Sequence, residues 1–268
     1  MPLVKFDNVS VSYYVPNLDP FGRAKAAKKI KDPDEGESNN AFVGGVIAKH
    51  RLYTEVQALI DISITANSGD RIGLVGVNGS GKSTFLKTCI GQLAPHTGKV
   101  SVEGKGAGLL ALGAGLKAKL SGRKNVELKG LYHGLTKSDL PALVEEAKQI
   151  SGLGDFFEMP ISTYSTGMIT RLTMSFLTLV EGDILILDEW VGTGDATVTD
   201  QANDLQERLL KSSTILVIAS HSESVLRSWT DQLIWLHQGK IEGFGKTDDI
   251  LPEYQYFVRG LKNRGLLT

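Results

Sequence analysis

The segment Gly76–Thr84 constrains the fold of this chain more than any other part of the sequence. It reads Gly-Val-Asn-Gly-Ser-Gly-Lys-Ser-Thr and fits the pattern G-x-x-x-x-G-K-[ST]. Its flanks predict a buried strand at Arg71 to Val75 and a helix at Ser83 to Ile90. Between such elements, glycines let successive backbone N–H groups turn inward around a phosphate chain. The segment therefore predicts a phosphate-binding loop at a strand-to-helix turn of an α/β fold.

The residue types of this loop indicate a nucleoside triphosphate as the ligand. We expect Lys82 to place a point charge on the β- and γ-phosphates and Ser83 to offer its hydroxyl to Mg²⁺. The helix N-terminus contributes the positive end of its dipole. A glycine-rich turn with an incidental lysine is the alternative, which the matched strand and helix disfavour. The residues expected to contact the ligand are Gly76, Asn78, Gly79, Ser80, Gly81, Lys82, Ser83 and Thr84.

Composition argues against several classes of protein. The 268 residues are 41% hydrophobic and 22% charged with a formal net charge of −1, which disfavours a dedicated nucleic-acid binder. The single cysteine, Cys89, excludes an internal disulfide framework, and core packing is favoured for it over a redox role. No apolar run approaches the roughly 20 residues of a membrane-spanning helix, and residues 1–5 do not begin a signal peptide. We therefore expect any role at a membrane to depend on a partner.

The hydrophobic pattern predicts strands towards both ends of the chain and helices between them. The period changes from two to 3.6 between about residues 122 and 180, which indicates a helical insertion inside an α/β domain. Its clearest helix follows Thr136 and Asp139, which are predicted to cap it. The apolar face of that helix is Leu140, Leu143, Val144, Ala147 and Ile150. Strands are expected at Leu3–Val11, Ile60–Ile64, Lys99–Glu103, Ile184–Leu187 and Thr214–Ser220, before a hairpin from Leu233 to Gly243.

The segment from about Val15 to Arg51 separates the first two strands and has two interpretations. Five basic residues lie between Arg23 and Lys31, and four acidic residues follow between Asp32 and Glu37. A solvated insertion is favoured, because the opposite charges follow at once and cancel the field. A basic helix that contacts anionic lipid or a membrane partner is the alternative.

Two other predicted strands end in residues suited to hydrolysis of a triphosphate. The apolar strand Ile184 to Leu187 is followed by Asp188 and Glu189. We expect Asp188 to hold Mg²⁺ through water and Glu189 to polarise the attacking water. His221 follows another apolar strand, where it can orient the γ-phosphate, and a surface histidine is the alternative.

The segment Tyr164 to Met168 precedes a helix with an apolar face and also has two interpretations. It is either an ordinary helix start capped by Ser165 or a second phosphate-binding helix N-terminus that acts on nucleotide held by another subunit. Ser165 lies 83 residues after Lys82 and 23 residues before Asp188. That spacing resembles the signature motif of ABC-transporter ATPases, where a helical subdomain lies between the phosphate loop and the catalytic strand.

With these motifs in that order, the chain resembles a single ABC ATPase domain over residues 1–268. The resemblance implies a RecA-like core, an N-terminal antiparallel β subdomain, a helical subdomain at about 120–180 and a C-terminal tail at about 245–268. It also implies ATP and Mg²⁺ as cofactors and a homodimer that sandwiches two ATP molecules.

The family resemblance assigns roles to individual residues. Lys82, Glu189 and His221 are implied to be catalytic. Gly194-Asp195 resembles the D-loop, so Asp195 is implied to communicate across the dimer. The residues implied to act on the partner's ATP are Ser165, Thr166, Gly167 and Met168.

Three segments resemble the polysaccharide exporters of this family. Asp188 to Ala196 reads Asp-Glu-Trp-Val-Gly-Thr-Gly-Asp-Ala, close to that group's Asp-Glu-Val-Leu-x-Val-Gly-Asp-Ala. Leu112 to Gly115 and Leu120 to Asn125 resemble its Leu-Gly-Ala-Gly-Phe and Leu-Thr-Gly-Arg-Glu-Asn segments. The resemblance implies the ATPase subunit of an O-antigen, capsule or teichoic-acid exporter at the cytoplasmic face of the cytoplasmic membrane. Another exporter, or a soluble ABC ATPase outside transport, is the alternative.

A membrane-spanning permease is the second implied partner. We expect the permease to contact the glycan. We expect this chain to bind the permease near Leu112–Asn125, between the α/β core and the helical subdomain. This chain itself is expected to bind neither glycan nor nucleic acid.

The chain departs from the family pattern in two places and leaves one contact open. Leu110 to Gly113 stands where a switch-loop glutamine is usual, and Trp190 follows Glu189 where small aliphatic residues are common. Adenine is expected to stack on Tyr14 or Tyr13 near the end of the first strand, with Tyr53 a competitor.

Overall fold

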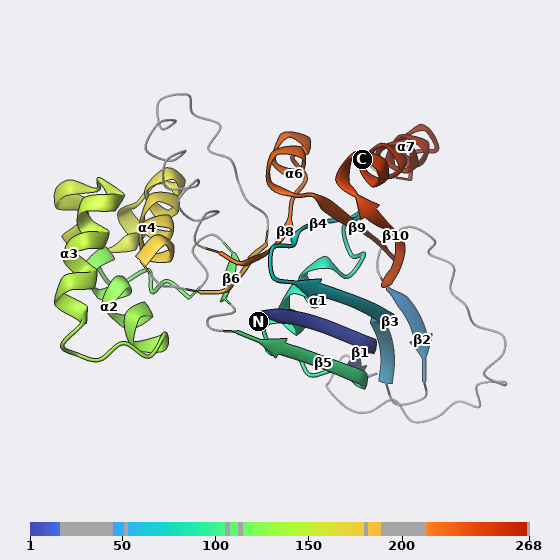
Figure 1. Ribbon diagram of the computed structural model, residues 1–268, viewed down its shortest axis with the longest axis horizontal. Coiled ribbons are helices and arrows are strands. Elements are labelled where there is room, and N and C mark those ends of the chain that lie inside the picture. Colours follow the sequence, from blue (N-terminus) through green and yellow to red (C-terminus); the bar gives the residue numbers. More distant parts are fainter. Residues whose placement is uncertain are drawn as a thin grey trace, which may run out of the picture. The chain divides into compact units, whose positions relative to one another are not determined.

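The computed structural model describes residues 1–16, 45–50, 53–104, 108–111, 115–179, 182–188 and 213–266 (Figure 1). The chain divides into two compact units. The sheet unit comprises Leu3–Glu103 and Ala219–Thr268, and the helical unit comprises Met1–Pro2 and Gly104–Ile218. Helices occur with both antiparallel and parallel strand pairs, so the predicted α/β fold class is confirmed. None of the helices among the described residues is long and apolar enough to cross a membrane.

A four-stranded antiparallel sheet in the order β2-β3-β1-β5 forms one layer of the sheet unit. Asn8, at φ +48°, lies in a bulge that separates Phe6 from Val9 while both side chains stay in the core. β1 continues well past the expected Val11, because its second half pairs with the start of β3. The strands are β1 (Leu3–Pro16), β2 (Val46–Lys49), β3 (Tyr53–Asn67) and β5 (Thr97–Glu103).

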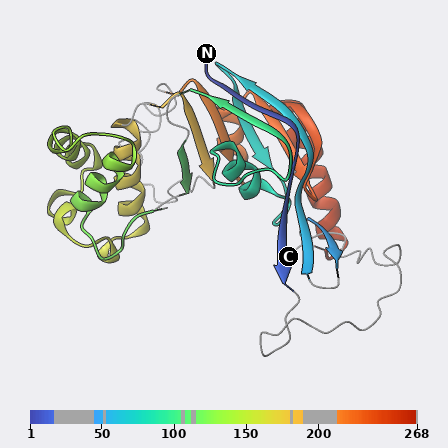
Figure 2. The ribbon, with the colours of Figure 1, turned by 90° about the horizontal axis from the view of Figure 1, so that it is seen from below.

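Strands β10-β9-β4 form a second layer of this unit and position the phosphate loop. β4 runs parallel to β9, with Val75 opposite Trp235, and β9 forms the predicted hairpin with β10. Helix α1 packs against the antiparallel sheet (Figure 2). Phe85 of α1 stacks on Phe6 of β1 with 4.7 Å between ring centroids. Cys89 of α1 is fully buried, which confirms it as a core residue, and burial raises the pKa of its thiol. The elements are β4 (Arg71–Val75), α1 (Lys82–Cys89), α6 (Glu223–Trp229), β9 (Gln232–His237), β10 (Lys240–Lys246) and α7 (Thr247–Asn263).

Three helices pack together in the helical unit. Of the predicted face of α3, Leu143, Val144 and Ala147 are buried, and Leu140 and Ile150 near its two ends are partly exposed. β6 and β7 pair in parallel, with Ala111 opposite Asp188, and β8 is the other neighbour of β7. The elements are β6 (Gly108–Ala111), α2 (Gly122–Tyr132), α3 (Leu140–Ser151), η1 (Gly154–Glu158), η2 (Ile161–Thr163), α4 (Thr166–Leu179), β7 (Ile184–Asp188) and β8 (Ile215–Ala219).

The predicted cap of α3 is corrected by the structure. Thr136 donates to the Asp139 carboxylate from its amide at 2.9 Å and from its hydroxyl at 2.6 Å. Both bonds from Thr136 end on Oδ2, and the Asp139 side chain accepts no hydrogen bond from the amides of α3. The pair closes the turn before the helix instead. Pro141 in the first turn has no amide hydrogen and therefore needs no cap.

Asn125 fixes the chain that leads into α2. Its side chain is buried, and Oδ1 accepts a hydrogen bond from the Lys117 amide at 2.6 Å. Nδ2 donates to the carbonyls of Lys117, Leu120 and Ser121. The side-chain amide therefore uses both its acceptor and its donors to hold the turn at residues 117–121 against the helix. In the sequence, Asn125 stands out only as part of the segment that resembles the polysaccharide exporters, and that resemblance predicts no physical role for it.

Replacing Asn125 with alanine should lower the free energy of unfolding by about 2–4 kcal/mol, because it removes the four hydrogen bonds of a buried side chain and leaves the Lys117 N–H without this acceptor. Gln149→Ala is the matched control, since Gln149 is exposed on α3 and donates to Glu145 at the surface. Chemical denaturation followed by circular dichroism measures both changes. A loss for Asn125→Ala no larger than that of the control would contradict the role of Asn125 as a clamp.

Candidate nucleotide site

The segment between β4 and α1 has the backbone of a phosphate-binding loop. Gly79 and Gly81 have φ values of +80° and +109°, in the left-handed region that favours glycine. Asn78 and Gly79 are exposed at the tip of the loop, whereas Ser80 and Lys82 are buried. The turn therefore exposes its backbone at residues 78 and 79, within the segment where the sequence pattern predicts the ligand.

The backbone of the loop is wedged against two other stretches of backbone. A Cβ atom at Gly81 would lie 2.5 Å from the Ala58 carbonyl oxygen in β3. The Gly239 amide, in the β9–β10 turn, donates to the Ser80 carbonyl at 3.0 Å, and the Ile60 amide donates to the Gly239 carbonyl at 2.8 Å. The loop, β3 and the hairpin turn are thus joined by hydrogen bonds, with no room for a side chain at position 81.

The donors of the loop suit a phosphate chain. Lys82 Nζ donates to the carbonyls of Gly76 at 2.7 Å and Val77 at 3.2 Å, so the ammonium group lies over the loop. Helix α1 has Gly81 as its N-cap and no side-chain cap, which leaves its first amides as donors for a ligand. The Ser80 hydroxyl is buried without a hydrogen-bond partner among the described residues. Amides, an ammonium group and a hydroxyl together match a polyanion.

The three candidate tyrosines differ in what they contact. Tyr13 is 39% exposed, and its hydroxyl lies 3.2 Å from the Thr84 hydroxyl of α1. Tyr14 is edge-on to Tyr53, with 5.3 Å between ring centroids, and lies beside His96. Successive residues of a strand face opposite sides, so the two neighbouring tyrosines point away from each other. Tyr13 is the tyrosine that contacts the helix of the phosphate loop.

His221 lies near the start of the phosphate loop. It is exposed between β8 and α6. A cavity of about 410 Å³ is lined by Val75, Ser220 and His221 together with residues of α6 and α7. Val75 is the last residue of β4 and directly precedes Gly76. The structure therefore places the predicted γ-phosphate sensor and the beginning of the loop at one cavity.

The remaining predicted residues of the site lie in the helical unit or outside the described residues. Asp188 ends β7 and is partly exposed. Glu189, Trp190 and Asp195 fall outside the described residues. Of the switch segment, Leu110 and Ala111 belong to β6, and the residues at 112 and 113 also lie outside the description.

The signature segment begins α4 with an open helix end. Ser165 Oγ accepts a hydrogen bond from the Met168 amide at 3.3 Å, so the predicted cap is confirmed. Thr166 is exposed. A Cβ atom at Gly167 would have a single neighbour within 4 Å, the Ser165 Oγ at 3.9 Å. Contacts among the described residues therefore do not require glycine at position 167.

A close contact behind the signature segment explains Gly122. Tyr164 Oη donates to the Phe156 carbonyl at 2.6 Å. A Cβ atom at Gly122 would lie 2.6 Å from that Oη and 2.9 Å from the Phe157 carbonyl oxygen. Two motifs that the sequence analysis recognised separately, at 120–125 and 164–168, are thus in contact. The order of the two motifs along the chain does not predict this contact.

Sequence patterns do not identify two other residues that lie next to the loop. Gly239 is predicted only as part of a hairpin turn. Tyr254 lies on α7 and lines the cavity at His221, together with Val75, the residue before the loop. An aromatic residue on an amphipathic helix is more often a core residue, so no local pattern marks Tyr254 as part of a site.

Comparison with known families agrees with this geometry. Residues 59–192 match the family described as ABC transporter, a range that includes the phosphate loop, the signature segment and Asp188. The chain belongs to the ABC transporter family.

Several curated relatives carry one name, teichoic acids export ATP-binding protein TagH. The proteins of Lactococcus lactis, Staphylococcus saprophyticus and Staphylococcus haemolyticus are 34%, 37% and 34% identical to this chain. The alignments cover 76%, 85% and 77% of this chain and 44%, 86% and 78% of the relatives. The chain therefore spans less than half the length of the Lactococcus protein and most of the two staphylococcal proteins.

Solved structures of ABC cassettes have the same fold. A dimeric ATP-binding cassette in a post-hydrolysis state, bound to ADP and Pi, has a TM-score of 0.65 at 18% identity, covering 91% of this chain and 98% of that one. The ATP binding subunit of an ABC transporter has a TM-score of 0.62 at 19% identity, covering 94% of this chain and 93% of that one.

The wedged backbone predicts that Gly81→Ala raises the Kd for ATP at least tenfold, roughly 1.4 kcal/mol or more. Gly91→Ala is the matched control: both glycines have positive φ, but nothing lies within 4 Å of a Cβ atom at Gly91. Gly91→Ala adds only the strain of a left-handed backbone at alanine, about 1 kcal/mol. Its Kd for ATP should stay within about twofold of the wild-type value. Titration with a fluorescent ATP analogue measures both constants. Equal changes in the two variants would show that the contact with Ala58 does not shape the loop.

Proposed function

We propose that this chain is the ATP-binding and ATP-hydrolysing subunit of an exporter of teichoic acid or a related cell-surface polysaccharide, such as O-antigen or capsule. The observation that carries the proposal is the uncapped glycine loop with Lys82 over it, in a chain whose relatives are named teichoic acids export ATP-binding proteins. The subunit works at the cytoplasmic face of the cytoplasmic membrane. Residues 1–268 act as one ATPase domain.

ATP binds with its phosphates at the loop of residues 76–84. The loop amides and the first amides of α1 surround the phosphates, and Lys82 exchanges its contacts with loop carbonyls for the β- and γ-phosphates. Ser83 would hold Mg²⁺ directly and Asp188 would hold it through water, and the ion would supply charge neutralisation for the transferring phosphoryl group. Tyr13 is the tyrosine that stacks on adenine, which its contact with Thr84 supports over Tyr14.

Hydrolysis is an in-line displacement by water. Glu189 accepts the proton of the attacking water, the new bond forms between water oxygen and the γ-phosphorus, and the bond to ADP breaks. His221 orients the γ-phosphate, and its place on the cavity at Val75 supports this role. Asp195 communicates between the two sites of the dimer.

Two copies of the chain form the active unit. The helix start at Ser165–Met168 of one copy acts on the ATP held by the loop of the other. The open space around Gly167 supports this assignment, because a helix end that approaches a partner's phosphate must stay free of side chains. Opening of the dimer after hydrolysis resets the channel of a polytopic permease, which is the partner that contacts the glycan.

Gly167→Asp should leave the Kd for ATP within about twofold and lower steady-state ATPase activity about 100-fold or more. A carboxylate at that helix start repels the partner's γ-phosphate and obstructs close approach. Gly154→Asp is the control, because Gly154 lies in the same unit and nothing lies within 4 Å of its Cβ position. Unchanged activity in Gly167→Asp, or weaker ATP binding by the separate subunit, would count against the shared site.

Glu189→Gln should keep ATP binding and lower turnover about 10²- to 10⁴-fold, because an amide cannot take up the proton of water. The same allele in the native host should reduce cell-surface polysaccharide, and wild type supplied in trans should restore it. Activity within a few-fold of wild type would remove Glu189 from the role of general base. Normal surface polysaccharide in cells with an inactive enzyme would overturn the proposed export.

A further inference from the structure

A buried serine closes the turn that carries His221. Ser220 directly follows β8 and is 4% exposed, and its Oγ accepts a hydrogen bond from the Ser222 amide at 3.1 Å. His221 lies between the two bonded residues and lines the cavity that Val75 also lines. Because the bond joins the neighbours of His221 on both sides, it fixes the direction in which the chain leaves β8, and with it the direction of the His221 side chain.

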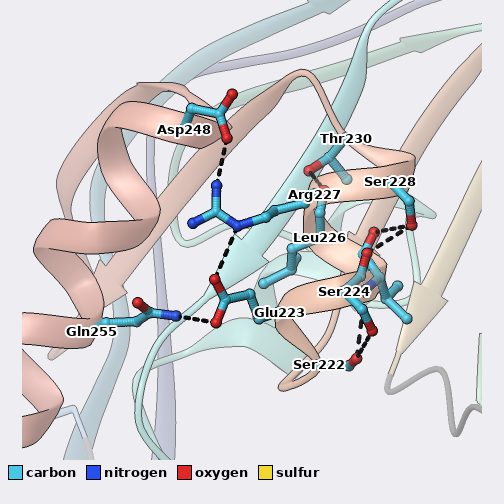
Figure 3. A network of polar contacts seen from close by, with 10 residues as sticks. Ser222, Glu223, Ser224, Leu226, Arg227, Ser228, Thr230, Asp248 and Gln255 are labelled. Atoms are coloured by element: carbon cyan, nitrogen blue, oxygen red, sulfur yellow. Dashed lines mark hydrogen bonds and ion pairs between the residues drawn. The ribbon is translucent and has the colours of Figure 1, made fainter.

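The residue that donates this bond also begins helix α6. Ser222 Oγ accepts a hydrogen bond from the Val225 amide at 3.5 Å and lies 2.9 Å from Ser224 Oγ (Figure 3). Ser222 is therefore the N-cap of α6, and it contacts Ser220 with its amide and the helix with its side chain. The turn at His221 is thus joined to α6 as well as to β8.

Polar contacts hold this helix against α7 (Figure 3). Glu223 accepts hydrogen bonds from Gln255 Nε2 at 2.8 Å and from Arg227 Nε at 2.9 Å, and Arg227 Nη1 donates to Asp248. These groups are largely exposed, so each contact contributes little to stability. Together they fix the register of α6 against α7, next to the residue that caps α6.

The far end of α6 is anchored in the interior of the sheet unit. The side chains of Thr230 and Thr247 are buried with their hydroxyl oxygens 3.0 Å apart, and Thr247 Oγ1 donates to the Thr230 carbonyl at 2.9 Å. Leu226 of α6 belongs to one buried cluster with Val75, the residue before the phosphate loop. Helix α6 therefore supports the turn at His221 from a fixed position relative to the start of the loop.

We propose that Ser220 is a positioning residue of the nucleotide site, whose hydroxyl closes the turn at His221 and so holds the imidazole towards the γ-phosphate. The inference rests on the proposed role of His221 in ATP hydrolysis. Without the acceptor, the Ser222 amide loses its partner and the turn adopts other conformations for part of the time. His221 is then correctly placed in only a fraction of the molecules, which lowers kcat. The donors of the phosphate loop are unchanged, so ATP binding is retained.

Ser220→Ala removes the hydroxyl and adds no atom. We expect kcat for ATP hydrolysis to fall about three- to tenfold, while the Kd for ATP stays within about twofold. Ser228→Ala is the matched control, because Ser228 is exposed on α6 and loses the same atom, a hydroxyl that donates to the Ser224 carbonyl at 2.7 Å. This control should keep kcat within about twofold of the wild-type value.

A double-mutant cycle shows whether Ser220 acts through His221. His221→Ala should itself lower kcat, and the addition of Ser220→Ala should lower it no further, because no imidazole is left to position. A residue that only stabilised the fold would lower kcat by the same factor in both backgrounds. Equal losses in the two backgrounds, or a wild-type kcat for Ser220→Ala, overturn the positioning role.

Amide hydrogen exchange at Ser222 supplies a readout that does not depend on catalysis. In the nucleotide-free full chain, Ser220→Ala should accelerate exchange of the Ser222 amide several-fold, and Ser228→Ala should not. Unchanged exchange in Ser220→Ala also overturns the proposal. The variants separate the two claims: if His221→Ala hydrolyses ATP as wild type does, the proposed role of His221 fails. If His221→Ala is impaired and Ser220→Ala behaves as wild type, only the role of Ser220 fails.

Discussion

The structure depends on the contact between the phosphate loop and two other stretches of backbone. The Gly239 amide holds the Ser80 carbonyl, and Gly81 lies against the Ala58 carbonyl with no room for a Cβ atom. A loop of this kind cannot be shaped by its own sequence, because its glycines allow many conformations. The antiparallel sheet and the terminal hairpin, far apart in the sequence, hold the loop in one of them. We infer from these contacts that the loop is formed before the ligand arrives, so the ligand does not have to order it.

Each unit carries a different kind of helix end. In the sheet unit, α1 begins without a side-chain cap beside Lys82. Tyr13 of β1 contacts α1, and His221 and Tyr254 line a cavity with Val75, the residue before the loop. In the helical unit, α4 has its Ser165 cap but stays open around Gly167. One helix start thus combines uncapped amides with a lysine, the donors that suit the phosphates of a nucleotide. The other offers amides and space without a lysine, which fits a group that completes a site held by a second copy.

Sequence reasoning succeeded where the determinants are local. The strand Arg71–Val75 was predicted with its observed bounds, α1 was predicted one residue late at each end, and the β9–β10 hairpin was found from its turn. Sequence reasoning failed where the structure depends on pairing between segments that are distant in the sequence. β1 extends to Pro16 because β3 supplies partners, and the predicted cap of α3 gave way to a bond between its own two members. The role of Asn125 depends on backbone groups of residues 117–121, which the periodicity of its own helix does not predict.

The most direct test of the account is a structure of the full chain with Mg²⁺ and a non-hydrolysable ATP analogue. The account predicts the phosphates at the amides of residues 79–83, adenine on Tyr13, and Lys82 Nζ moved from the Gly76 and Val77 carbonyls to the β- and γ-phosphates. The loop backbone should keep its contacts with Ala58 and Gly239. Nucleotide bound elsewhere, or a loop that must rebuild its backbone to bind, would contradict the claim that this site is formed before the ligand arrives.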